Sequence, residues 1–179
     1  MGGGDKPLRS LAGRPMLDWM LDALRPYHDA VALSANGDPA RFAAWGLPVL
    51  PDGDFAGDGP LAGVLAGLRW AGARGAEAVL AVPGDAPLLP GDLAAQLAPA
   101  PAYAVTGGQA HPLPALVPAG AADALADWLR AGQPRRVRLF LDAIGASPRD
   151  FGANAAQRFL NVNTPADLAT AEALVQRTG

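Results

Sequence analysis

Apolar residues recur along the chain at two spacings, which predict helices and strands in alternation. In residues 15–25 and 60–73 they fall at helical intervals, and each stretch opens on a proline suited to a first turn. Residues 78–82 are apolar throughout, which is typical of a strand covered on both faces. Further helices are expected at 39–45, within 89–97, and at 121–130, 135–144 and 164–176. Further strands are expected at 30–35, 47–50, 103–106 and 113–117.

This alternation of strands and helices predicts one α/β layered domain with a mostly parallel sheet. A length of 179 residues suits a single domain, and a hydrophobic content of 50% is enough to form a core. No internal repeat or linker interrupts the pattern. Ligands of such sheets bind beyond the carboxyl ends of the strands, so the residues that follow each strand are the candidates for function.

Composition and charge exclude several classes of protein. A charged fraction of 17% and a net charge of −3 argue against disorder and against a general nucleic-acid binder, which needs a basic surface. Zero cysteines exclude a disulfide scaffold and a thiolate metal site. No apolar run is long enough to span a membrane, and the N-terminal residues lack the apolar core of a secretory signal. We therefore expect a cytoplasmic protein with no membrane or nucleic-acid partner.

Three polar residues follow predicted strands and are candidate site residues. Asn36 comes after the strand at 30–35, Asp52 after 47–50, and Asp85 after 78–82. A carboxylate at Asp85 could hold Mg²⁺ against nucleotide phosphates, since Mg²⁺ prefers one or two carboxylates plus phosphate oxygens. A turn or a helix cap is the alternative interpretation of Asp85.

Lysine occurs once among the 14 Lys and Arg residues, as Lys6, directly after a glycine-rich start. Flexible backbone N–H groups beside a cation suit a phosphate. The segment is not a Walker A loop, because Pro7 follows the lysine in place of Ser or Thr. The alternative is a solvated lysine on a loose terminus.

The other polar segments allow two interpretations each. The acidic loop at 52–59 fails the EF-hand pattern, because its twelfth position is Gly63. The arginines at 135–138 could be a solvated helix face or an anion contact. His111 could be structural or a ligand donor, and His28 is expected to be a surface cation at a helix end. Asn163 or Thr164 explains the start of the last helix, which leaves Asn161 as a possible ligand amide.

Taken together, these segments resemble the molybdenum cofactor guanylyltransferase family over nearly the whole chain. The matching segments are residues 1–8, 11–17, 34–36, 52, 59–63, 84–87, 111–112, 135–137 and 161–165. The glycine-lysine start and Gly-Asp-x-Pro at 84–87 belong to the wider nucleotidyltransferase superfamily. His-Pro at 111–112, Arg-Arg-Val at 135–137 and Asn-Val-Asn-Thr-Pro at 161–165 favour the guanylyltransferases.

The resemblance implies transfer of GMP from GTP to the molybdopterin form of the cofactor, with release of pyrophosphate. It implies that Lys6 contacts the GTP phosphates, that Asn36 and Asp52 contact the nucleotide, and that Asp85 binds Mg²⁺. Asn161 and Asn163 would serve the pterin side. Lys6 and Asp85 would then be the catalytic pair, and contact with molybdoenzyme maturation proteins is a further partner expectation. The implied fold is a three-layer α/β/α Rossmann-like nucleotidyltransferase.

Family members begin with a strand and a Leu-Ala-Gly-Gly-x-x-x-Arg loop before the segment that opens this sequence. We therefore expect residues 1–179 to form a single nucleotidyltransferase domain, truncated at the N-terminus, with the first strand of the sheet missing. Because nucleotide choice would depend largely on that loop, two alternatives remain open. One is a related enzyme that uses CTP or a sugar- or cyclitol-phosphate acceptor; the other is a non-catalytic nucleotide-binding remnant.

Overall fold

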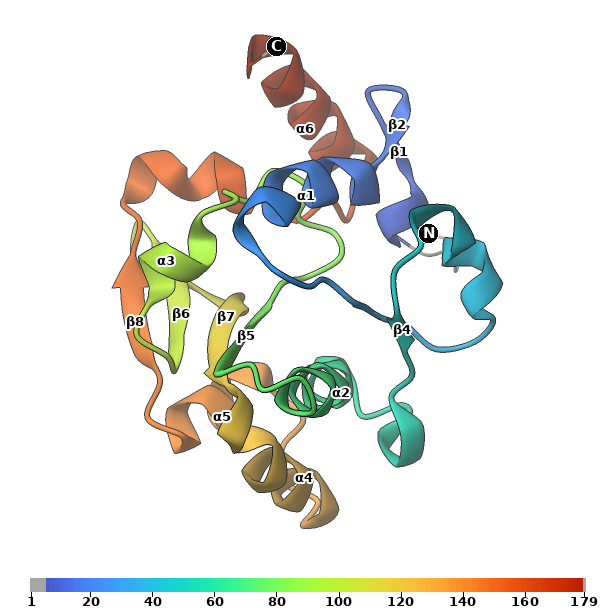
Figure 1. Ribbon diagram of the computed structural model, residues 1–179. Coiled ribbons are helices and arrows are strands. Elements are labelled where there is room, and N and C mark those ends of the chain that lie inside the picture. Colours follow the sequence, from blue (N-terminus) through green and yellow to red (C-terminus); the bar gives the residue numbers. More distant parts are fainter. Residues whose placement is uncertain (1–5, 179) are drawn as a thin grey trace.

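The computed structural model describes residues 6–178, and the glycine-rich segment at 2–4 lies outside them (Figure 1). The α-helices are α1 (Met16–Leu24), α2 (Pro60–Gly72), α3 (Leu93–Leu97), α4 (Ala122–Arg130), α5 (Val137–Ala143) and α6 (Pro165–Thr178). The strands are β1 (Ser10–Leu11), β2 (Arg14–Pro15), β3 (Leu33–Ser34), β4 (Val49–Leu50), β5 (Ala78–Ala81), β6 (Ala102–Thr106), β7 (Gln109–Pro118) and β8 (Ser147–Asp150). Short 3-10 helices are η1 (Lys6–Leu8), η2 (Arg25–Tyr27), η3 (Pro39–Trp45), η4 (Gly53–Phe55), η5 (Ala119–Ala121) and η6 (Ala153–Phe159).

The main sheet has four strands in the order β5-β7-β6-β8, and helices cover both of its faces. Tyr103 and Val117 point to one face, where they pack with α2, α4 and α5. Ala104 and Leu116 point to the other face, where they pack with α3 and η6. Because side chains alternate between the faces of a strand, neighbouring residues of β6 and β7 serve separate cores. This arrangement confirms an α/β fold layered on both sides of the sheet.

The prediction of a mostly parallel sheet is wrong, because the sheet is mixed. β7 pairs antiparallel with both β5 and β6, and only β6 and β8 run parallel within it. The physical reason is the two-residue turn Gly107-Gly108, which joins β6 to β7 with φ of 54° and 81°. Positive φ at both positions is the backbone of a tight hairpin turn, and a hairpin makes its strands antiparallel. The prediction that residues 103–106 and 113–117 belong to paired strands is thereby confirmed, although a shift of register makes residues 104–106 pair with 109–111.

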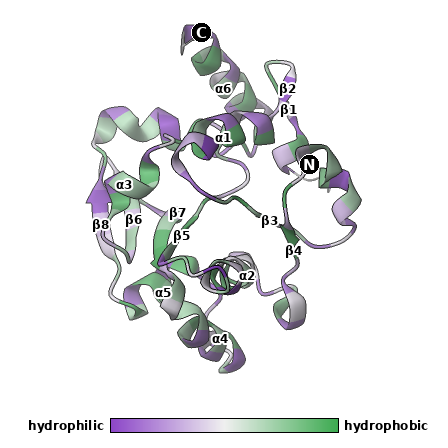
Figure 2. Ribbon diagram, in the orientation of Figure 1, coloured by the Kyte–Doolittle hydropathy of each residue, from purple (hydrophilic) through white to green (hydrophobic). Residues whose placement is uncertain are grey.

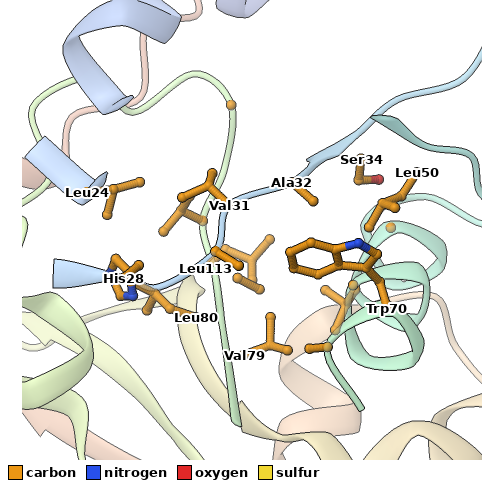
Figure 3. Close-up of a pocket in the computed structure, with 18 of the residues that line it drawn as sticks. Leu24, His28, Val31, Ala32, Ser34, Leu50, Trp70, Val79, Leu80 and Leu113 are labelled. Carbon is orange, nitrogen blue, oxygen red and sulfur yellow. The ribbon is translucent and has the colours of Figure 1, made fainter. Parts of the chain in front are cut away.

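β3 and β4 form a separate parallel pair that is not hydrogen-bonded to β5. A cavity of about 1000 Å³ lies between this pair and β5. Val31 and Ala32 line one side of the cavity, and Val79 and Leu80 line the other (Figure 3). The strand predicted at 30–35 is shortened to Leu33–Ser34, the two residues that pair with β4. Among the described strands β5 pairs only with β7, and all four of its residues are half-buried.

The hydropathy pattern did not predict β8 or the short β1–β2 hairpin. β8 reads Ser-Pro-Arg-Asp and lies at the edge of the sheet, where it forms a hydrophilic strip (Figure 2). An edge strand with charge and proline has no apolar signal to detect, although such residues protect an edge from pairing with other chains. Within residues 6–178, no helix is long and apolar enough to cross a membrane.

Candidate functional site

Three predicted site residues from distant parts of the chain meet at one point. The Lys6 ammonium lies 2.8 Å from Oδ2 of Asp85 and donates to Oδ1 of Asn163 at 2.5 Å. Lys6 belongs to η1, Asp85 follows β5, and Asn163 precedes α6. The carboxylate of Asp85 has an exposed side-chain fraction of 16%, against 44% for Lys6, so a ligand can reach the cation side of the pair. One cation therefore bridges a carboxylate and an amide oxygen.

The backbone explains why these side chains meet. The N–H of Val162, which is buried, donates to the carbonyl oxygen of Asp85 at 2.7 Å and joins the two segments. Gly84 makes room for η1, because a Cβ atom there would lie 2.8 Å from Cγ of Pro7. A separation below 3.0 Å is a clash, so a glycine before Asp85 lets the Lys6 segment approach.

Asn36 and Asp52 form a second group at the ends of β3 and β4. The Asn36 amide donates to Oδ2 of Asp52 at 2.6 Å, and the N–H of Asp52 donates to Oδ1 of Asn36 at 2.9 Å. The Ser34 hydroxyl is a weaker donor to Asp52, at 3.5 Å. Parallel strands end at the same edge of a sheet, so β3 and β4 place these side chains together. The pair holds the Asp52 carboxylate in one orientation.

Both groups open on the large cavity between β3 and β5. Its lining includes Lys6, Ser34, Asp52, Gly59 and Asp85. Its other walls are mainly apolar, with Trp70 and Leu113 projecting inward and Ser34 beside Leu50 (Figure 3). The cavity thus combines an apolar surface with charged groups, among them the Lys6 ammonium and the Asp52 and Asp85 carboxylates, which is the chemistry that a nucleotide and its metal need.

Gly63, in the first turns of α2, lies against the Asn36–Asp52 group. A Cβ atom on Gly63 would be 2.3 Å from Oγ of Ser34 and 3.8 Å from Oδ1 of Asp52. Four residues further along the same helix, a Cβ on Gly67 would meet Cγ1 of Val79 at an ordinary 3.8 Å. The close approach of α2 to β3 therefore favours glycine at position 63, because a Cβ atom there would displace the Ser34 side chain.

We expect Gly63→Ala to lower the free energy of unfolding by about 1–3 kcal/mol, because it overpacks this contact. Gly67→Ala is the matched control and should raise the free energy of unfolding by roughly 0.5–1 kcal/mol, since alanine favours a helix interior. Adding Ser34→Gly to Gly63→Ala should recover most of the loss. Urea denaturation of the four proteins tests this. Equal effects of the two alanine variants would contradict the close approach.

The basic cluster at 135–138 divides into two parts. Arg138 is ion-paired with Asp142 at 2.8 Å and stacks over the ring of Tyr103, as a helix-face arginine does. Arg135 instead forms an ion pair with Asp58 of the acidic loop at 52–59. All three arginines of the cluster line a second cavity of about 440 Å³ together with Asn161. Asn161 therefore shares a cavity with three cations, two residues before the Asn163 that contacts Lys6.

Burial lowers the pKa of both histidines, His28 and His111. Nε2 of His111 lies 2.7 Å from Oγ1 of Thr106, and its ring stacks on Phe159 at 5.1 Å. Burial lowers the pKa of His111, and these contacts support the structural interpretation. Burial also lowers the pKa of His28, more than the nearby Asp29 raises it. The prediction that His28 is a surface cation is therefore wrong.

These two histidines predict that stability falls as the pH is lowered through the range 7 to 5. A histidine whose pKa is lower in the folded protein binds protons more readily when unfolded, so acid favours unfolding in this range. Urea denaturation at pH 7 and pH 5 measures the change, and the double variant His28→Gln/His111→Gln should show a smaller one. An unchanged pH dependence in that variant would contradict the assignment.

Comparison with known proteins identifies the family of this chain. Residues 1–144 match the MobA-like NTP transferase domain. The molybdenum cofactor guanylyltransferase of Acidiphilium cryptum is 52% identical over 173 residues, which cover 97% of this chain and 88% of the relative. That of Cereibacter sphaeroides is 49% identical over 181 residues, covering 99% of this chain and 91% of the relative.

Two solved structures show the same fold at low identity. Molybdopterin-guanine dinucleotide biosynthesis protein A from Archaeoglobus fulgidus has a TM-score of 0.73 and 19% identity, covering 98% of this chain and 92% of that chain. The 2-C-methyl-D-erythritol 4-phosphate cytidylyltransferase from Thermus thermophilus has a TM-score of 0.62 and 20% identity, covering 98% and 96%. The structural likeness supports an α/β nucleotidyltransferase fold. The sequence relatives go further: this chain belongs to the molybdenum cofactor guanylyltransferase family, with a MobA-like NTP transferase domain.

Proposed function

We propose that this chain transfers GMP from GTP to the molybdopterin form of the molybdenum cofactor and releases pyrophosphate. The observation that carries the proposal is the contact of Lys6 with both Asp85 and Asn163. It joins Lys6 and Asp85, two of the residues expected on the nucleotide side, to Asn163, one of the two expected on the pterin side. The relatives named guanylyltransferases, at 49–52% identity, support the same activity.

The nucleotide side would use Lys6, Asn36, Asp52 and Asp85. Lys6 is a partly exposed cation at the cavity and can donate to phosphate oxygens. The Asn36–Asp52 pair lies at the far end of β3 and β4, where it can contact the rest of the nucleotide. A nucleotide held by Lys6 at its phosphates and by the Asn36–Asp52 pair at its other end would have its α-phosphate between these two contacts. Such binding would position the α-phosphate for transfer.

Asp85 would hold Mg²⁺ together with the GTP phosphates. Its carboxylate follows a strand at the cavity, and one or two carboxylates plus phosphate oxygens are a sufficient ligand set for Mg²⁺. Within residues 6–178, no cluster of three or more His, Cys, Asp or Glu residues could hold a metal, so the phosphates would complete the ligand set. Bound Mg²⁺ supplies positive charge that stabilises the pyrophosphate leaving group.

The acceptor side would use Asn161 and Asn163, with the second cavity and its three arginines beside Asn161. A terminal phosphate oxygen of molybdopterin would attack the α-phosphorus of GTP in line. The bond from the α-phosphorus to the bridging oxygen then breaks, and pyrophosphate leaves. Lys6 stabilises the charge that develops on the leaving group, and the step needs no side-chain nucleophile.

Turnover measured with different substrates tests the proposal against its alternatives. Purified protein with Mg²⁺ and molybdopterin should release pyrophosphate from GTP at least tenfold faster than from CTP. Faster release from CTP, or from GTP with a sugar- or cyclitol-phosphate acceptor, would favour a related nucleotidyltransferase. GTP binding with no turnover would favour a non-catalytic binding protein. Contact with molybdoenzyme maturation proteins stays a prediction.

We also infer that residues 6–178 make up one nucleotidyltransferase domain whose sheet accepts a further strand between β3 and β5. The apolar cavity at this place and the half-buried residues of β5 support the inference. A strand there would join the separate pair β3–β4 to the four-stranded sheet. It would also cover the apolar side chains that now face the cavity.

A further inference from the structure

The helix α6 begins with a reciprocal set of hydrogen bonds centred on Asp167. Oδ2 of Asp167 accepts from the N–H of Asn163 at 3.0 Å and from the N–H of Thr164 at 2.7 Å. In return, the N–H of Asp167 donates to Oγ1 of Thr164 at 3.1 Å. This arrangement is a capping box, in which a helix start and the side chain of its third residue satisfy each other.

The capping box holds the residue that contacts Lys6. Asn163 and Thr164 are exposed, so packing alone does not fix their backbone. On one side, buried Val162 is anchored by its hydrogen bond to the Asp85 carbonyl. On the other side, Asp167 holds the N–H of Asn163 itself. The Asn163 side chain projects from between these two anchors to Lys6.

The five α-helices that precede α6 in the described part of the chain have no such capping hydrogen bond at their start. In α1, α2, α3, α4 and α5, all within the described residues, the N-cap side chain makes no capping hydrogen bond. Those helices start without a side-chain cap and are stabilised by packing. The capping box is therefore not a general device of this fold, and it occurs next to the residue that bridges to Lys6.

We propose that Asp167 is a positioning residue for the acceptor side of the site, acting through the backbone of Asn163. This inference rests on the proposed function and extends it to a residue that contacts neither Lys6 nor Asp85 in the structure. The hydrogen bonds from Thr164 and Asn163 also lower the pKa of Asp167, so its carboxylate stays ionised as an acceptor at neutral pH.

The test compares Asp167→Ala with Asp167→Asn. Both hydrogen bonds go to one oxygen, so the single amide oxygen of asparagine can accept both, while alanine accepts neither. Asp167→Ala should raise the KM for molybdopterin roughly fivefold to tenfold, the size that corresponds to loss of one helix cap, with the KM for GTP changed less than about twofold. In Asp167→Asn, the KM for molybdopterin should stay close to the wild-type value.

Two controls separate positioning from general stability. Asp123→Ala removes the first-turn acid of α4, away from the site, and should leave both KM values unchanged. In an Asn163→Ala background, Asp167→Ala should produce no further rise in the KM for molybdopterin, because residues that act through each other are not additive. Additive effects would overturn the inference, as would equal rises in both KM values.

Hydrogen exchange gives a readout that does not depend on turnover. The amides of Asn163 and Thr164 should exchange faster in Asp167→Ala than in the wild-type protein or in Asp167→Asn, because they lose their acceptor. Unchanged exchange would overturn the inference. If the wild-type protein releases no pyrophosphate from GTP, the proposed function fails, and the exchange rates alone decide whether Asp167 positions Asn163.

Discussion

Replacing Asp85 with alanine should reduce pyrophosphate release from GTP by about 100- to 1000-fold, the cost of removing one group that stabilises transition-state charge. The carboxylate is the proposed protein ligand for Mg²⁺, and it also lies 2.8 Å from the ammonium of Lys6. Its loss would remove the metal contact and leave Lys6 bound only to Asn163 at this point. Both effects act on the charge of the leaving pyrophosphate.

Asp92→Ala is the matched control for Asp85→Ala. Asp92 is an exposed aspartate seven residues further along, and its carboxylate accepts from the amide of Gln96. We expect this variant to keep at least half of the wild-type rate. Initial rates at saturating GTP and Mg²⁺, with circular dichroism to confirm folding, give the comparison. A folded Asp85→Ala variant that retained a third of the wild-type rate would remove Asp85 from the mechanism.

The second large effect concerns the cavity between β3 and β5. An apolar strand of about five residues, fused ahead of Met1 through a flexible linker, should raise the Tm by roughly 5–10 °C. Each buried apolar side chain contributes about 1.5–3 kcal/mol, and ordering each residue costs about 1.5 kcal/mol. Main-chain hydrogen bonds to β3 and β5 add about 0.5–1.5 kcal/mol each. For a chain of this length, the expected rise in Tm corresponds to a net gain of about 2–4 kcal/mol in the free energy of unfolding.

A fusion of equal length with proline and aspartate at alternate strand positions is its control. Proline removes the donors that a sheet interior needs, and aspartate cannot be buried without a partner, so this peptide should not enter the cavity. Thermal unfolding of both fusions and of the unmodified chain gives the comparison. The inference of a strand site fails if both fusions change the Tm equally.

Much of the fold was predictable because local patterns and tertiary packing agree. The helix α2 was predicted at residues 60–73 and spans Pro60–Gly72, since its apolar face at Leu61, Leu65 and Leu68 is also its buried face. The hairpin of β6 and β7 was predicted as a strand pair. The antiparallel direction of these strands was not predicted, because an alternation of strands and helices gives no information about the Gly107-Gly108 turn.

The candidate site was predicted by the positions of polar residues after strands. Asn36 and Asp52 follow predicted strands and contact each other, and Asp85 follows β5 and meets Lys6. The sequence analysis did not predict contacts between segments that are far apart in the chain. Asp58 pairs with Arg135 across 77 positions of the sequence, and Gly63 is set by the close approach of Ser34. Such contacts depend on tertiary geometry, which spacing along the chain does not encode.

Identification of the nucleotide product tests the central claim most directly. Purified protein, GTP, Mg²⁺ and molybdopterin are incubated together, and the products are separated and weighed by mass spectrometry. We predict one molybdopterin-guanine dinucleotide for each pyrophosphate released, with neither formed when molybdopterin is omitted. Pyrophosphate release at an equal rate without molybdopterin, or no dinucleotide at all from folded protein that binds GTP, would contradict guanylyl transfer at this site.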